Sequence, residues 1–303
     1  MTGTLLLFAI AGFVASFVDG ALGMGFGPTS SSILLASGLA PQAVSASVNI
    51  AKVVTGVASG VAHWRFRNLD RALILKLAIP GCLGALVGVT VLSNISGATL
   101  RPYLAMLLTV VGVRILVRFA QPMPPTQKDV PVHGSLKKTI KYDPRGVKAA
   151  AFIGGITNGL IGAWGPVVTP FLLHRGVRPR YAIGCVNTAE IAVASTSAFS
   201  IVAAMGSTQF SGTLVLALLL GGVVAAPFAA WATRRIPTRA MGIAVATLLL
   251  LTNAREILGW GNVDGLWLWV VYVGILATSA YALVLYPHHA ARSSLAAVSH
   301  TTN

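Results

Sequence analysis

The sequence contains an internal repeat whose two copies lie 138 positions apart. The first copy consists of Gly27, Pro28, Gly38, Pro41, Asn49 and Lys52. The second consists of Gly165, Pro166, Gly176, Pro179, Asn187 and Glu190, so that only the last position changes its charge. Just upstream, Asp19 and Gly23 correspond to Asn158 and Gly162 when one residue is dropped. Paired, glycine-interrupted apolar segments of this kind point to the binding site of a secondary transporter.

The composition places this repeat in a membrane. Of the 303 residues, 55% are hydrophobic and only 10% are charged, whereas a soluble domain carries about 25% charged residues. Several apolar stretches are long enough, or nearly so, to cross about 30 Å of hydrocarbon as helices: 72–92, 103–117, 213–230, 241–251 and 266–285. The alternating short segments of an outer-membrane barrel do not occur. We therefore expect an all-α, polytopic membrane protein in contact with the lipid bilayer.

The net charge of +15 comes from 22 Lys and Arg against 7 Asp and Glu. These basic residues lie in short loops beside apolar spans, as the positive-inside rule predicts for cytoplasmic loops, so we expect no nucleic-acid partner. The cysteines, Cys82 and Cys185, lie in apolar stretches without metal-ligand spacing. No catalytic triad, histidine cluster or cofactor fingerprint is present in the sequence. We expect neither an enzyme nor a cofactor or metal.

Loop charges also predict the topology. Loop 63–76 has four basic residues against one acidic, and 118–148 has seven against two, so both are expected in the cytoplasm. The uncharged loops 93–100 and 204–212 are expected outside, and 233–239, with three arginines, inside. The helix after Pro41 then ends inside and its partner after Pro179 ends outside.

The two repeats are therefore expected to be inverted relative to one another. Each would contain a helical hairpin broken at its glycines and three spans, and one unpaired helix would follow. The expected divisions are repeat 1 at 1–119, a cytoplasmic linker at 120–147, repeat 2 at 148–259, the extra helix at 260–287 and a cytoplasmic tail at 288–303. The N-terminus would lie outside. It lacks the basic residues of a signal peptide, so we expect it to be retained.

The glycine-rich breaks are the first candidate site. Gly20, Gly23, Gly25 and Gly27 are mirrored by Gly154, Gly155, Gly159, Gly162 and Gly165. Pro28 and Pro166 follow directly, in what we take to be the first helical position. Free N–H groups at such helix starts favour anions. Alternatively, the glycines only allow close helix packing.

The second candidate is the set Asn49, Lys52, Asn187 and Glu190. Each pair is spaced i, i+3, so both of its side chains share a helix face. Ionisable residues inside a span usually face a cavity or a partner, and we expect Lys52 and Glu190 to approach one another near the midplane. The alternative is a purely structural ion pair. Asp19 either binds a coupling proton or cation, or caps the following helix, and Asn158 replaces it in the second repeat.

With the two breaks, Gly38-x-x-Pro41, Gly176-x-x-Pro179 and the loop Trp64-Arg65-Phe66-Arg67 in view, the chain resembles the TauE/SafE family over about residues 5–285. The resemblance implies export of small sulfur-containing anions, such as sulfite or organosulfonates, across a bacterial inner membrane. A transporter of another small organic anion and a non-transporting scaffold or accessory subunit remain alternatives. The sequence leaves the exact substrate, coupling ion, transport direction and oligomeric state open.

Overall fold

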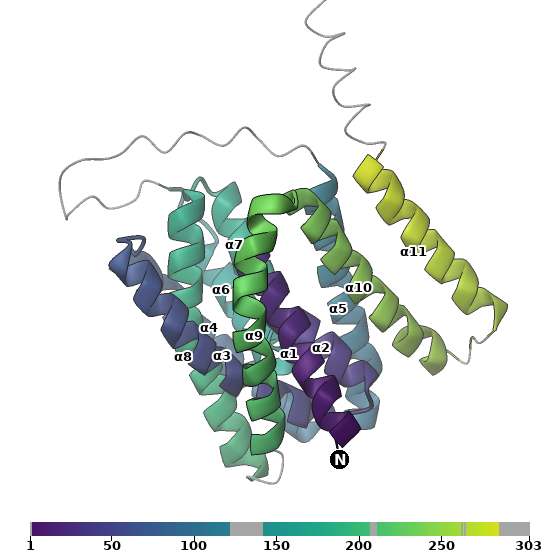
Figure 1. The fold of residues 1–303 in the computed structure, drawn as a ribbon. Coiled ribbons are helices and arrows are strands. Elements are labelled where there is room, and N and C mark those ends of the chain that lie inside the picture. Colours follow the sequence, from purple (N-terminus) through teal and green to yellow (C-terminus); the bar gives the residue numbers. More distant parts are fainter. Residues whose placement is uncertain (1, 122–141, 207–210, 262, 264, 285–303) are drawn as a thin grey trace, which may run out of the picture.

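The computed structural model describes residues 2–121, 142–206, 211–261, 263 and 265–284. Over these ranges the chain forms eleven helices and no strand (Figure 1). The first five are α1 Thr2–Leu22, α2 Phe26–Ala36, α3 Pro41–Arg65, α4 Arg71–Asn94 and α5 Gly97–Ala120. The next five are α6 Val147–Ile161, α7 Gly165–His174, α8 Pro179–Met205, α9 Gly212–Arg235 and α10 Thr238–Trp260, and α11 Leu266–Val284 follows. The all-helical fold predicted from the sequence is confirmed.

Seven of the described helices are long and apolar enough to cross a membrane: α3, α4, α5, α8, α9, α10 and α11. Two others are too short to cross alone. At about 1.5 Å per residue, the 11 residues of α2 and the 10 of α7 cover only about half of the hydrocarbon core. Because each short helix follows a glycine break, the breaks lie well inside the helical bundle.

Several boundaries follow from local chemistry. Asp70 begins α4 by accepting a hydrogen bond from the backbone N–H of Leu73 at 2.8 Å. Ser96 caps α5 in the same way through Thr99, at 3.2 Å. Such side chains satisfy N–H groups that have no acceptor within the helix. The spans thus start where the sequence provides a capping residue after a polar loop.

The long helices pack across the two halves of the chain. Helix α1 packs along α9 and α6 along α4, while α3 packs against α8 and α5 against α10; the α1–α9 pair lies at the front of Figure 1. The α4–α6 contact is close because Gly84 and Gly88 abut the backbone of Phe152 and Ile156, where a Cβ would overlap carbonyl oxygens. Small residues allow this approach in membranes. Gly84 and Gly88 therefore set the close contact between α4 and α6.

The structure corrects one assignment made from the sequence. Gly154, Gly155 and Gly159 do not form the second break, because they lie inside α6. Gly155 and Gly159 face α4, whereas Gly154 faces Trp164 and Val168. Gly20 likewise lies inside α1, against Ala229 of α9, and not in the first break. The break itself is confined to residues 162–164. The predicted divisions of the chain and the inversion of one repeat remain predictions. Linker residues 122–141 and tail residues 285–303 lie outside the described residues.

Candidate functional site

The two glycine breaks meet at the centre of the bundle. Gly27, in the first turn of α2, packs so tightly against the carbonyl of Gly162 that a Cβ at Gly27 would overlap that oxygen. Gly162 ends α6 with a φ of 69°, in the left-handed region where glycine carries no steric penalty. Equivalent elements of the two repeats thus touch through backbone alone.

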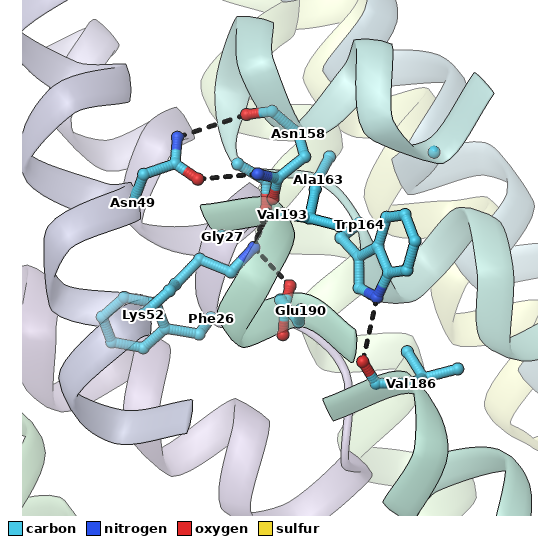
Figure 2. A network of polar contacts seen from close by, with 12 residues as sticks. Phe26, Gly27, Asn49, Lys52, Asn158, Ala163, Trp164, Val186, Glu190 and Val193 are labelled. Carbon is cyan, nitrogen blue, oxygen red and sulfur yellow. Dashed lines mark hydrogen bonds and ion pairs between the residues drawn. The ribbon is translucent and has the colours of Figure 1, made fainter. Parts of the chain in front are cut away.

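Lys52 of α3 reaches into this contact. Its Nζ donates hydrogen bonds to the Asn158 side-chain oxygen at 2.7 Å and to the Gly162 carbonyl at 2.6 Å. It also forms an ion pair with Glu190 of α8 (Figure 2). The Lys52 side chain is 5% exposed and that of Glu190 is 18% exposed. The predicted approach of the two repeat-equivalent charges is present in the structure.

Two buried asparagines, Asn49 and Asn158, form a hydrogen-bonded pair beside Lys52. The Asn158 side-chain amide donates to Asn49 Oδ1 at 2.7 Å and to Ser197 Oγ at 3.0 Å. In return, Asn49 Nδ2 donates to the backbone carbonyl of Asn158 at 3.3 Å, and both asparagines are fully buried. These bonds orient the Asn158 oxygen towards Lys52 (Figure 2).

Asp19 occupies the first break differently from its counterpart. Its Oδ1 accepts a hydrogen bond from the backbone N–H of Phe26, in the first turn of α2, at 3.3 Å. Asp19 therefore makes the contact expected of a helix cap, and its carboxylate lies at the end of α2 that favours negative charge. Asn158, at the equivalent place, turns to Lys52 instead.

A small enclosed cavity lies between these groups, with a volume of about 10 Å³. It is lined by Asp19, Gly23, Met24, Gly25, Phe26, Gly27, Pro28, Lys52, Gly162, Gly165, Pro166, Asn187 and Glu190. A volume of this size holds roughly one water molecule. The structure is therefore closed around the site, and an anion of several heavy atoms requires the walls to separate.

The cavity gathers most of the residues selected from the sequence. Nine candidates line it: Asp19, Gly23, Gly25, Gly27, Lys52, Gly162, Gly165, Asn187 and Glu190. Two more lie outside the lining, where Asn158 accepts a hydrogen bond from Lys52 and Asn49 accepts one from Asn158. The first turns of α2 and α7 both line this cavity. Their prolines are not at the first helical position: Pro28 is third in α2 and Pro166 second in α7. A proline is tolerated there because N–H groups throughout the first turn lack an intrahelical acceptor.

Sequence reasoning missed a set of buried serines that join the halves. Ser31 Oγ donates to the carbonyl of Ile161 and Ser45 Oγ to that of Gly159, both at 2.7 Å. These bonds satisfy carbonyls at the end of α6, which lack partners within the helix. The run Thr-Ser-Ser-Ser at 29–32, in an otherwise apolar segment, was the available signal.

A larger, more open hollow lies elsewhere, between α5 and α10. Its volume is about 310 Å³, and its lining includes Arg101, Arg255, Glu256 and Trp260. Arg101 pairs with Glu256 at 3.1 Å. This hollow contains none of the candidate site residues, so we place the functional site in the smaller, enclosed cavity.

Together, the spanning helices, the paired breaks and the central charges define a multi-pass membrane protein of the transporter class. The chain matches the family model "Sulfite exporter TauE/SafE" over residues 8–255 and belongs to that family. It is 38% identical over 255 residues to the probable membrane transporter protein YtnM of Bacillus subtilis (strain 168), covering 84% of this chain and 83% of the relative. No solved structure matches.

Proposed function

We propose that the protein is a secondary active transporter that exports small sulfur-containing anions, such as sulfite or an organosulfonate, across a bacterial inner membrane. The observation that carries the proposal is the Lys52–Glu190 ion pair, which joins the two repeats inside a cavity lined by two helix starts. Family membership supports the substrate class.

The cavity suits an anion for two reasons. The first turns of α2 and α7 present backbone N–H groups and the positive ends of their helix dipoles. Lys52 adds the only cationic side chain among the lining residues. An entering anion competes with Glu190 for Lys52, so substrate occupancy is linked to breaking the contact between α3 and α8. Because this contact joins the repeats, breaking it can drive the change between inward- and outward-facing forms.

A scaffold or accessory subunit is a weaker explanation. Removing a lysine and a glutamate from water is costly inside a membrane, and apolar side chains would join the same helices without that cost. A binding role for Lys52 explains why the charges are present.

The test is flux of labelled sulfite and of labelled methanesulfonate in liposomes containing the purified protein. Lys52→Met should reduce flux by about 10- to 100-fold, because a charge-assisted hydrogen bond from Lys52 to the bound anion would contribute about 1.5–3 kcal/mol. Lys76→Met is the matched control, since Lys76 lies outside the cavity and contacts Tyr142. Normal flux in Lys52→Met, with the protein monodisperse in detergent, would refute the proposal.

We also propose the inverted topology, with the N-terminus outside and the linker and C-terminus inside. Single cysteines at Asn94 and Arg145, introduced after replacing Cys82 and Cys185 by alanine, test it. An impermeant thiol reagent added to intact cells should label position 94 and not 145. Labelling of both from the same side would contradict the topology.

A further inference from the structure

The residues that line the cavity carry more negative than positive charge. Asp19 and Glu190 contribute two carboxylates, and Lys52 contributes the only positive side chain. Asp19 interacts electrostatically with Lys52, and Glu190 with both. Helices α2, α6 and α7 add no charged side chain to the lining. Helix α9, which packs on α1, ends in Arg235, but that guanidinium stacks on Trp231. With all three groups ionised, the empty cavity carries one net negative charge.

This imbalance opposes entry of an anion. A monovalent anion would raise the net charge of the walls and substrate from −1 to −2. Two like charges 4 Å apart repel by about 4 kcal/mol at an effective dielectric constant of 20, which corresponds to roughly a thousandfold loss of affinity. The anion would also take Lys52 from Glu190, leaving both carboxylates without their shared cation. Uptake of one proton would hold the net charge at −1 throughout.

We propose that each anion occupies the cavity together with one proton, which is taken up by the Asp19–Glu190 carboxylate pair, so that proton and anion cross the membrane in the same direction. This inference rests on the proposed function, and it identifies the proton as the ion whose transport is coupled to that of the anion. The proton binds to a carboxylate oxygen on one side and leaves it on the other, and no other bond changes. Net flux then follows the sum of the two gradients, and export occurs when the anion accumulates in the cytoplasm.

A proton fits the site better than a metal cation. Metal ions such as Ca²⁺ bind six to eight oxygen ligands, and Mg²⁺ six. Among the described residues, no group of three or more His, Cys, Asp or Glu side chains could hold such an ion. The oxygens of Asn158 and Gly162 already accept hydrogen bonds from Lys52, and the ammonium group would repel a second cation. The cavity has space for only about one water molecule.

The second repeat suggests which substitution would test the coupling to protons. Asn158 stands where the first repeat has Asp19, so Asp19→Asn gives both breaks the same residue. The asparagine oxygen can still accept the N–H of Phe26, which preserves the cap. The empty cavity then becomes neutral, and a bound anion gives −1, the charge of the wild-type cavity when empty. Proton uptake is no longer required, so anion flux should lose its coupling to pH.

The experiment measures labelled methanesulfonate uptake and internal pH together, using liposomes that contain a trapped pH dye. A sulfonate stays ionised over the pH range used, so any response to pH belongs to the protein. In wild type, acidifying the outside should speed uptake several-fold, and each anion should bring in about one proton. Because the pair is electroneutral, an imposed potential should not change the rate. In Asp19→Asn, the ratio of uptake rates with and without the pH gradient should fall to about one.

Glu256→Gln is the matched control, because Glu256 is also an ion-paired carboxylate but lies outside the cavity. It should keep the wild-type ratio. If Asp19→Asn does not assemble, the proton-to-anion ratio of wild type still decides the matter. Uptake that ignores the pH gradient, follows a sodium gradient or moves protons in the opposite direction would overturn the inference while leaving the proposed function intact. Failure of wild type to move either sulfite or methanesulfonate would instead refute the proposed function, and the inference with it.

Discussion

The two glycine breaks share a backbone plan but differ in chemistry. In the first, Asp19 lies against the start of α2 and accepts the N–H of Phe26. In the second, the equivalent Asn158 accepts a hydrogen bond from Lys52, and α7 begins without a side-chain cap. The comparison teaches that the repeat sets where the site is, whereas single substitutions between the copies determine what it binds. The first break carries the negative charge of Asp19, and the second helps to position Lys52 through Asn158.

The helices that follow the breaks differ in the same way. Asn49 is fully buried and bonded to the second break, whereas its counterpart Asn187 lines the cavity and contacts Ser59 at 3.3 Å. Lys52 and Glu190 complete the asymmetry with opposite charges. Three sets of substitutions test how far the two copies have diverged, and they are ordered here by expected effect.

The largest effect on stability is expected for Gly27→Ala. The new methyl group would overlap the Gly162 carbonyl oxygen, which cannot move without separating the two breaks. Overpacking of this kind costs about 1–3 kcal/mol, so we expect a clearly lower Tm in detergent and a loss of flux. Gly38→Ala is the control, because its φ of 94° disfavours alanine but nothing lies within 4 Å of the added Cβ. A smaller Tm loss for Gly27→Ala than for Gly38→Ala would show that the breaks are not in close contact.

Replacing the two asparagines should separate structure from transport. Asn49→Ala removes an acceptor from the buried Asn158 amide, and a buried polar group left without a partner costs about 1–3 kcal/mol. Asn187→Ala removes one contact at the cavity wall and should cost less than about 1 kcal/mol. Thermal unfolding and flux are measured on both. We expect Asn49→Ala to lower Tm more than Asn187→Ala does. We expect Asn187→Ala to change the flux measured per amount of protein. Equal losses of Tm would contradict a structural role for Asn49 that Asn187 lacks.

The smallest effect concerns an ion pair between Asp143, at the end of the linker, and Arg175 of the second repeat, whose counterpart in the first repeat is Ser37. The backbone N–H of Arg145 at 3.0 Å and the guanidinium of Arg175 at 2.6 Å hold the pKa of the Asp143 carboxyl below its ordinary value of 3.8. The stabilisation is therefore complete above that value and disappears as pH falls through the lowered pKa. Asp143→Asn should slightly lower Tm at pH 7, and the difference should vanish in strong acid. A Tm difference that grows on acidification would show that the sign is wrong.

Much of this site was accessible from the sequence, because the repeat restricts the geometry. Two ionisable residues at equivalent positions of the two copies are expected to approach one another, and Lys52 and Glu190 are indeed in contact. The packing partners were not predictable. Small residues on α1 and α6 indicate close contact but not with which helix. The Arg101–Glu256 pair was missed for the same reason, since its residues lie 155 positions apart without a repeat relation.

The exchanged packing of α1 on α9 and of α6 on α4 has a consequence for biogenesis. A ribosome makes α1 before α9, and the surface on which α1 packs is synthesised only after seven further helices. The early hairpin must therefore wait in the membrane, with Gly27 not yet packed against Gly162, until most of the chain has been translated. Neither half can finish folding from its own sequence. Assembly of this protein is completed by its later helices, and a ribosome stalled before α9 leaves an unfinished first half.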